Sequence, residues 1–240
     1  MAHLHRFYVD PGNLGADTVV LPFEESHHAL HVVRVRIGDN VELFDGRGHV
    51  MSGKVTGMSR REVSLAVETV RDVPPPDHRI VIVQGWLNRD KPIDRLVNMA
   101  TALGVAQLRF FRAGHSDRRP QVTGKLKRVA VESCKQSGRA WLPVFKTSAC
   151  LADALDDAPK PRLIATKDIQ PVPIRKTLQT RPAAVSVIVG PEGDFTEDEL
   201  RQALGLGATP TTLGDTTYRA ETAATLLTAI ALYELGELGQ

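Results

Sequence analysis

Two short turns near the carboxyl end of the chain hold the residues best placed to do chemistry. An apolar, β-branched run at 185–189 leads into Gly190, Pro191, Glu192 and Gly193, and a second turn follows at Leu213 and Gly214. Glycine lets a backbone approach a ligand closely, and open α/β sheets bind ligands at the carboxyl ends of their strands. The two turns therefore predict a pocket built largely from backbone, of a kind that can hold a nucleoside.

A plain strand-to-helix connection is the alternative reading of either turn taken alone. The prediction depends on both turns and on the string that follows them, Arg219, Ala220, Glu221, Thr222 and Ala223. No Gly-x-Gly-x-x-Gly follows the first strand of the alternating strand–helix region, which disfavours an ordinary dinucleotide site. The chain also lacks the Gly-x-x-x-x-Gly-Lys-Ser/Thr phosphate loop.

The middle of the chain is strongly basic. Positions 85–146 carry thirteen Lys or Arg against four Asp or Glu, a net +9 in a chain whose total is only +2. Such asymmetry indicates a polyanion partner on one face, and well-solvated helix faces are the alternative. The cations expected to contact the phosphates of a nucleic acid are Arg118, Arg119, Lys125, Lys127, Arg128, Lys135 and Arg139, with Arg34 and Arg36 extending the surface.

Composition limits the other possibilities. At 240 residues with 42% hydrophobic content, the chain can bury a sizeable core as one large or two small domains. It has no apolar run long enough for a membrane span and no apolar segment typical of a signal peptide at its start. Two cysteines, with no Cys-x-x-Cys pair, favour a reducing, cytoplasmic location and no structural zinc. The cluster His27, His28 and His31 lacks completing ligands, so no metal is expected.

A run of three prolines divides the chain. We predict a domain at 1–72, a stiff linker at 73–77 and a second domain at 78–240. Short β-branched segments before the linker predict a small β-barrel with strands at 7–9, 19–21, 40–44, 49–55 and 62–67, a hairpin turn at 45–48 and a helix at 24–33.

After the linker, strands alternate with helices, which predicts an α/β domain with a largely parallel sheet. The expected strands lie at 79–84, 108–111, 162–165 and 185–189, and the expected helices at 91–103, 123–137, 197 to about 205, and 219–235. Thr196 and Glu199 have the spacing of a capping box. The last helix is apolar nearly all round, which is typical of a helix buried in a core or against a partner.

These residues together resemble the RsmE family of the SPOUT superfamily. In the first domain the matching positions are Arg6, Phe7, His28 and the stretches 33–36, 38–39 and 44–48. In the second they are Lys91, 100–101, 103–105, 136–137, Arg139 and Pro143, followed by 190–193, 213–214, Arg219 and 221–223. The resemblance covers nearly the whole chain.

The resemblance implies a PUA-like β-barrel domain followed by a SPOUT α/β domain with a C-terminal trefoil knot, which general topology rules would have argued against. It also implies a homodimer that transfers a methyl group from S-adenosylmethionine to N3 of a uridine in 16S ribosomal RNA, free or within the 30S subunit. The cofactor would be held by Gly190, Pro191, Glu192, Gly193, Leu213, Gly214, Thr222 and Ala223.

Arg219 and Glu221 are the candidate catalytic residues. Uracil N3 is a poor nucleophile until its proton is lost, so a cation that favours the anion, or a base, helps the transfer. Arg219 could stabilise the developing oxyanion or hold a phosphate, and Glu221 could orient Arg219 or accept the proton. A purely structural Arg–Glu pair at the start of the helix is the alternative.

The chain departs from the family pattern at four positions: Ala102 and Lys135 stand where the family has Glu, Thr216 where it has Arg, and Asp194 where it has Gly. These departures keep two rivals open. One is a non-catalytic RNA-binding or ribosome-assembly factor on the same fold. The other is a SPOUT methyltransferase with a different RNA target.

Overall fold

The computed structural model describes residues 4–13 and 16–239, and the chain divides into two compact units. Unit 1 extends to Pro75 and also contains Cys134–Leu142. Unit 2 consists of Pro76–Ser133 and Pro143–Gln240. The first break falls between the second and third prolines of the run at 74–76, and nothing in the composition indicated that 134–142 folds with the first unit.

Unit 1 is a five-stranded sheet that curls around one core. Its strands are β1 (His5–Tyr8), β2 (Thr18–Val20), β3 (Asn40–Phe44), β4 (His49–Met58) and β5 (Val63–Asp72), in the order β1-β3-β4-β5-β2. Its helical segments are η1 (Pro11–Asn13), α1 (Phe23–His27) and η2 (His28–Val33), a π-helical turn. Phe7 and Val19, from the two edge strands, share the core with Leu43 and Leu65.

The predicted hairpin turn between β3 and β4 is present. Gly46 and Gly48 both have positive φ, 71° and 98°, which glycine adopts without a steric penalty. The Asp45 carboxylate holds the turn closed by accepting from the backbone N–H of Arg47 at 2.7 Å and of His49 at 3.1 Å.

The segment 134–142 is fastened to unit 1 by polar contacts. Arg6 donates from Nη1 to the Cys134 carbonyl at 2.7 Å, and the Trp141 indole N–H donates to the Val73 carbonyl at 2.9 Å. Burial raises the pKa of the Cys134 thiol to about 12, so this thiol is protonated and behaves as a core residue.

Unit 2 is built on a six-stranded parallel sheet in the order β11-β9-β10-β6-β7-β8. The strands are β6 (Arg79–Gly85), β7 (Gln107–Phe111), β8 (Val144–Ser148), β9 (Arg162–Ala165), β10 (Ala184–Val189) and β11 (Ala208–Thr211). The helices are α2 (Asp90–Ala102), α3 (Gly124–Ser137, which ends within unit 1), α4 (Leu151–Leu155), α5 (Ile174–Leu178), α6 (Glu197–Gly205) and α7 (Ala220–Leu235).

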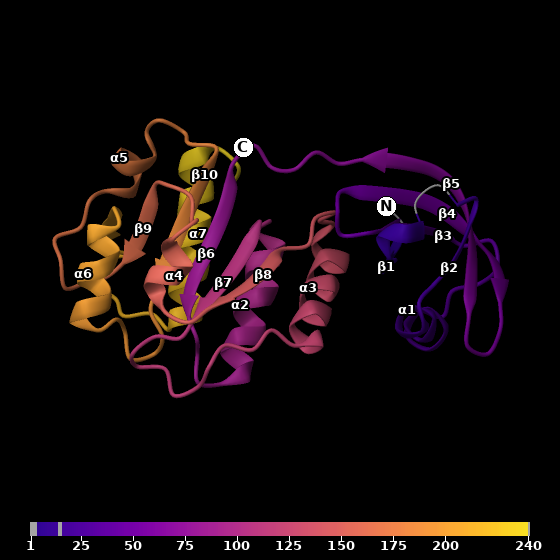
Figure 1. The fold of residues 1–240 in the computed structure, drawn as a ribbon. Helices are drawn as coiled ribbons and strands as arrows, with labels where there is room; N and C mark the ends of the chain where they lie inside the picture. The colour runs from indigo at the N-terminus through magenta and orange to yellow at the C-terminus, as the bar shows by residue number, and fades with distance from the viewer. Residues whose placement is uncertain (1–3, 14–15, 240) are drawn as a thin grey trace. The chain divides into compact units, whose positions relative to one another are not determined.

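Helices cover the sheet, with β6 and β10 side by side in its middle (Figure 1). Val81 and Val83 of β6 point into a core shared with α4 and α6. Side chains alternate along a strand, so Ile80 and Ile82 face the other layer, where α7 packs on β6 and β10 beside α2. Burial on both sides explains why β6 and β10 read as continuous apolar runs.

The sequence signals for the start of α6 and for the extent of the last helix, α7, are confirmed. Thr196 Oγ1 accepts from the Glu199 N–H at 3.2 Å, and the Glu199 carboxylate accepts from the Thr196 N–H at 2.9 Å, which completes the capping box of α6. The last helix extends over the predicted residues and ends at Gly236, with φ 80°. The sequence reasoning missed β8, β11, α4 and α5.

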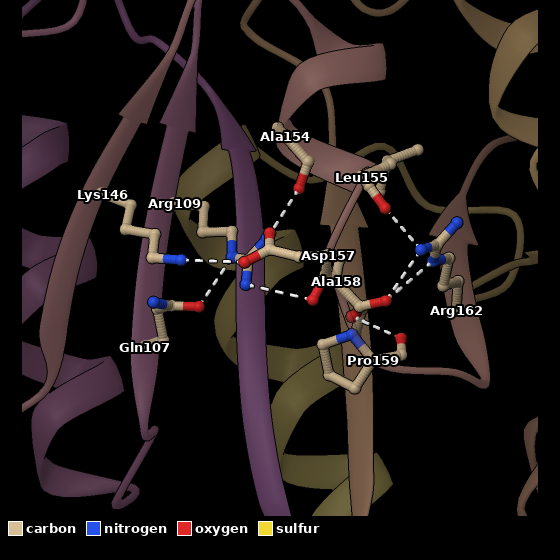
Figure 2. Close-up of polar contacts among 10 residues, drawn as sticks. Gln107, Arg109, Lys146, Ala154, Leu155, Asp157, Ala158, Pro159 and Arg162 are labelled. Atoms are coloured by element: carbon tan, nitrogen blue, oxygen red, sulfur yellow. Dashed lines mark hydrogen bonds and ion pairs between the residues drawn. The ribbon is translucent and has the colours of Figure 1, made fainter.

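Two buried arginines bind the carboxyl end of α4 (Figure 2). Arg109 donates to the Ala154 carbonyl at 3.1 Å and to Asp157, and Arg162 donates to the carbonyls of Ala158 at 2.7 Å and of Leu155. The last carbonyls of a helix lack partners within the helix and carry partial negative charge. The two guanidinium groups donate hydrogen bonds to these carbonyls and place positive charge beside them.

Burial, followed by repulsion from Arg109, lowers the pKa of Arg162 from its ordinary value. Hydrogen bonds from Lys146 and Arg109 lower the pKa of Asp157. Asp157 therefore remains ionised and supplies the negative charge that these two cations face.

Replacing Arg162 with Met should destabilise the protein. The change removes the guanidinium of a residue that is 5% exposed, and it leaves the carbonyls of Leu155 and Leu206 without this donor. We expect a loss of roughly 2–4 kcal/mol in the free energy of unfolding, measured by chemical denaturation. Arg175→Met is the matched control: its side chain is 82% exposed, so we expect a change within about 0.5 kcal/mol. Equal stability of both variants would contradict the role of Arg162.

Candidate functional site

A cavity opens at the carboxyl ends of the three neighbouring strands β9, β10 and β11. It encloses about 120 Å³. Its lining includes Thr166 and Lys167 after β9, Asp194 after β10, Leu213, Thr216 and Tyr218 after β11, and Ala223 in the first turn of α7. The cavity therefore lies between the two turns that the sequence singles out.

The turn after β10 is packed tightly against the end of β6. A Cβ added to Gly85 would lie 2.7 Å from both the backbone nitrogen and Cδ of Pro191, a separation that packed atoms do not reach. Gln84 donates its side-chain amide to the Gly190 carbonyl at 2.7 Å. The Glu192 carboxylate accepts from the backbone N–H of Asn88 at 3.0 Å. These contacts define the course of 190–193.

Asp194 continues this turn in the left-handed region, with φ 61°. Asn and Asp tolerate that region better than other non-glycine residues, because their short side chains bond to nearby backbone. Here Asp194 Oδ1 accepts from the N–H of Phe195 at 2.8 Å. The departure from the family's glycine at this position is thus accommodated locally.

Lys167 ties the loop after β9 to the loop after β11. Its ammonium donates to the Asp215 carbonyl at 2.7 Å and to the Thr217 hydroxyl at 3.0 Å. Thr212 Oγ1 accepts from the N–H of Gly214 at 3.2 Å, in a turn where Gly214 has φ 92°. The segment that leads into α7 is thereby held at two points.

Arg219 and Glu221 begin α7 but point to different surroundings. Arg219 is the N-cap residue; its carbonyl accepts from the N–H of Ala223 at 2.8 Å, and its exposed side chain takes no part in the cap. Glu221 is 6% exposed and faces Arg95 of α2, with 4.0 Å between oxygen and nitrogen. In the part of the chain that the structure describes, the ion pair of Glu221 is with Arg95 rather than Arg219.

Some of the predicted cofactor residues line the cavity, and the others lie in the turns and the helix beside it. Leu213 and Ala223 line the cavity, while the turn 190–193 lies beside Asp194, which also lines it. Gly214 shapes the second turn, and exposed Thr222 follows Glu221 on α7. The sequence reasoning missed Thr166 and Lys167, although their position after a strand that neighbours β10 places them at the same edge of the sheet.

The predicted RNA-contacting cations are mostly exposed. Within unit 2, Arg118 pairs with Asp90 at 3.1 Å and Lys125 with Asp94 at 2.7 Å. The other exposed cations of the set are Arg119, Lys127 and Arg128 in unit 2 and Arg34 and Arg36 in unit 1. Arg139 of unit 1 is half-buried.

Lys135 differs in its surroundings from the other cations predicted to contact phosphates. Its side chain is only 7% exposed and pairs with Glu25 at 3.2 Å inside unit 1. A buried ammonium needs such a partner. Nothing in the sequence pattern of basic residues distinguishes Lys135 from its exposed neighbours.

Residues 4–13 and 16–239 contain no group of three His, Cys, Asp or Glu side chains that could hold a metal ion. No helix in the same part of the chain is both long enough and apolar enough to cross a membrane.

Family models match both parts of the chain. An RNA methyltransferase domain matches residues 74–232, and an RNA methyltransferase PUA domain matches residues 21–68. The chain belongs to the RNA methyltransferase family.

Relatives extend over nearly the whole chain. A ribosomal RNA small subunit methyltransferase E from Aquifex aeolicus (strain VF5) is 27% identical over 241 residues, covering 95% of this chain and 99% of the relative. A ribosomal RNA small subunit methyltransferase E from Neisseria gonorrhoeae, solved bound to S-adenosyl methionine, is 27% identical with a TM-score of 0.83 and covers 96% of this chain and 98% of that one.

A probable rRNA-methyltransferase from Porphyromonas gingivalis is also 27% identical, with a TM-score of 0.83 over 98% of this chain and all of that chain. These findings confirm the predicted resemblance to the RsmE family and the predicted order of domains, a PUA domain followed by an α/β RNA methyltransferase domain.

Replacing Lys167 with Met should loosen the loop between β11 and α7. The change removes both hydrogen bonds from the ammonium to this loop, so we expect the amides of 213–218 to exchange with solvent roughly tenfold faster. Hydrogen exchange followed by mass spectrometry measures this change. Lys176→Met, an exposed lysine on α5, is the control and should leave 213–218 unchanged. Unaltered exchange in the Lys167 variant would show that the loop does not depend on this lysine.

Proposed function

We propose that this protein transfers a methyl group from S-adenosylmethionine to N3 of a uridine in small-subunit ribosomal RNA. The observation that carries the proposal is the cavity bounded by the loops after β9, β10 and β11, with Tyr218 and Ala223 at its α7 side. Full-length similarity to small subunit methyltransferase E proteins supports the RNA class. A cytoplasmic location follows from that substrate.

The donor set of the cavity fits S-adenosylmethionine. Ala165, Leu213 and Ala223 supply apolar surface for a flat ring, and Thr166, Thr211 and Thr212 supply hydroxyl and backbone groups. Bound there, S-adenosylmethionine would supply a methyl group on a positively charged sulfur. The tight packing of Gly85 against Pro191 gives the β10 turn little freedom, so the site is preorganised by backbone.

The residues at the start of α7 would act on the uracil. Methylation would form a bond from N3 to the methyl carbon, break the bond between that carbon and the sulfur, and release the N3 proton; the electron pair of the broken bond stays on the sulfur, and S-adenosylhomocysteine leaves. The exposed guanidinium of Arg219 would stabilise the negative charge that develops on the ring as that proton leaves. Glu221 would act indirectly by holding Arg95, because its buried carboxylate faces the Arg95 guanidinium across 4.0 Å. The alternative, which the sequence left open, is that Glu221 accepts the proton directly.

We propose further that the protein works as a homodimer. α7 and α2 pack together on one layer of unit 2, and each presents large apolar side chains to solvent: Met99 on α2, and Ile230 and Tyr233 on α7. Tyr233 is 61% exposed. A partner that covered these side chains would remove apolar area from water.

The rival is an RNA-binding assembly factor without turnover. Calorimetry with S-adenosylmethionine separates the two, because a factor that has lost the pocket releases no binding heat. Methyl transfer to another RNA position is distinguished by mass spectrometry of ribosomal RNA from a deletion strain: loss of N3-methyluridine from the small-subunit RNA supports the proposal, and an unchanged small-subunit RNA contradicts it.

Arg219→Ala should separate catalysis from cofactor binding. If the guanidinium stabilises charge on the ring, kcat falls about 100-fold or more, while the Kd for S-adenosylmethionine changes by less than about threefold, since the predicted cofactor contacts are mostly backbone. Steady-state methylation and calorimetry measure the two quantities. Arg201→Ala, an exposed arginine on α6 that pairs with Asp198, is the control and should retain full kcat. A normal kcat in Arg219→Ala would contradict a role for Arg219 in the methyl transfer.

RNA affinity should depend strongly on salt. Each phosphate neutralised by a cation releases condensed counterions, so with several contacts affinity falls by about tenfold or more between ~50 and ~200 mM salt. Lys127→Ala should lower the slope of log K against log salt by about 0.7, the loss of one contact to a single strand. Lys176→Ala should leave the slope unchanged. A flat salt profile would mean that the basic surface does not bind phosphates.

A further inference from the structure

Three segments of unit 1 that are distant in the sequence meet at one end of its sheet. Just before α1, Leu21 donates its backbone N–H to the carbonyl of Val63, the first residue of β5, at 3.0 Å. After η2, Gly38 donates to the carbonyl of Val55 in β4 at 2.8 Å. The turn that joins β4 to β5 lies between these two acceptors in the chain. We call this region, formed by the start of α1, the segment 34–38 and that turn, the hairpin end of unit 1.

Large apolar side chains are exposed at the hairpin end. Phe23, the first residue of α1, and Ile37, in the segment after η2, are each 67% exposed, and Met58, the last residue of β4, is also exposed. The start of α1 is fixed beside the turn, because Ser26 Oγ accepts from the Val63 N–H at 3.2 Å. Exposed apolar groups gathered in one place are typical of an interaction surface.

A row of ring side chains begins at Phe23 and follows α1 into η2. His27 and His31 come four and eight residues after Phe23, and residues four apart lie on the same side of a helix. The rings of His27 and His31 have centroids 4.5 Å apart and planes tilted by 49°. Both histidines are exposed, so the row presents three flat rings to solvent.

The same segments carry positive charge that no neighbour neutralises. The exposed arginines of the hairpin end are Arg34, Arg36, Arg60 and Arg61. Within residues 4–13 and 16–239, none of these four side chains forms an ion pair, whereas Arg118 and Lys125 of unit 2 are each paired with an aspartate. The exposed acids of these segments are Glu24 and Glu62, half as many. Unpaired cations in excess on one surface favour an anionic partner.

Single-stranded RNA combines the two features that match this surface. Its unpaired bases have flat faces that stack on aromatic side chains, and its phosphates contact arginines. A duplex keeps its base faces inside the helix, so it makes no use of the rings. A membrane surface is bound through an aliphatic face, whereas His27 and His31 are polar rings that suit bases better than hydrocarbon.

We propose that the hairpin end of unit 1 binds an unpaired stretch of the RNA substrate, with one base stacked on Phe23. The inference rests on the proposed function for the identity of the ligand as RNA. Neighbouring bases follow the row of His27 and His31, and Arg60 and Arg61 contact the phosphates between them. The surface therefore adds a stacking contact to the phosphate contacts of the basic helices in unit 2.

Binding of a short, fluorescein-labelled oligoadenylate to the whole protein, followed by fluorescence anisotropy, tests the stacking contact. Phe23→Ala should raise the Kd about tenfold, the loss of one base–aromatic stack. Phe23→Leu keeps an apolar side chain without a ring and should bind as weakly as Phe23→Ala, whereas Phe23→Trp should bind at least as tightly as the wild type. Val70→Ala, which removes an exposed apolar side chain elsewhere on β5, is the control and should leave the Kd unchanged. Wild-type affinity in Phe23→Ala overturns the proposal.

Charge is tested separately from stacking. Arg61→Gln should lower the slope of log K against log salt by about 0.7, the loss of one phosphate contact on a single strand. Arg71→Gln, at the opposite end of β5 and paired with Glu42 at 3.3 Å, is the matched control and should keep the wild-type slope. An unchanged slope in Arg61→Gln overturns the phosphate contact.

Two other ligands distinguish the partner. An RNA duplex of the same length should bind Phe23→Ala and the wild type equally, because its bases cannot reach the ring. Vesicles of phosphatidylglycerol provide the lipid alternative. Equal weakening of duplex and oligoadenylate by Phe23→Ala, or weakened binding to the vesicles alone, overturns the proposal. None of these assays needs methyl transfer: its absence in the wild-type protein would contradict the proposed function, and oligoadenylate binding would still report on the hairpin end.

Discussion

The parallel pairing of β10 with β6 is the constraint on which the rest of the structure depends. It places the carboxyl ends of two strands, more than one hundred residues apart in the chain, directly beside each other. Because Gly85 has no side chain, the backbone of Pro191 can approach it to a distance that a Cβ would forbid. The Gly-Pro-Glu-Gly turn therefore has one course, and it leads into Asp194, which lines the cavity at the ends of β9, β10 and β11.

The loops at this edge of the sheet are connected through side chains that bond to backbone. Glu192 accepts from Asn88, and Asn88 Oδ1 accepts from the N–H of Asp117 at 3.0 Å. On the other side, Lys167 attaches the segment at Asp215 to the loop after β9. Charged side chains thus set loop positions, and backbone forms much of the binding surface.

The sequence predicted the elements whose signals are local and long. The apolar runs of β6 and β10, the capping box at Thr196 and the helix before Gly236 have periods or end signals that one segment contains. β11 was missed because Pro210 argues against a strand; it is tolerated because β11 is an edge strand. α4 and α5 have five residues each, too few for a helical period. Pairs such as Glu221 with Arg95, Lys135 with Glu25, or Lys167 with Asp215 depend on the tertiary fold, and no spacing rule reveals them.

The central claim is that the loops after β9, β10 and β11 bind the methyl donor. The most direct measurement is a crystal structure of the protein with S-adenosylmethionine. The account predicts the donor in the cavity lined by Leu213, Tyr218 and Ala223, with its polar groups bonded to backbone of those loops. A donor bound elsewhere, or a cavity that remains closed to it at saturating concentration, would contradict the account.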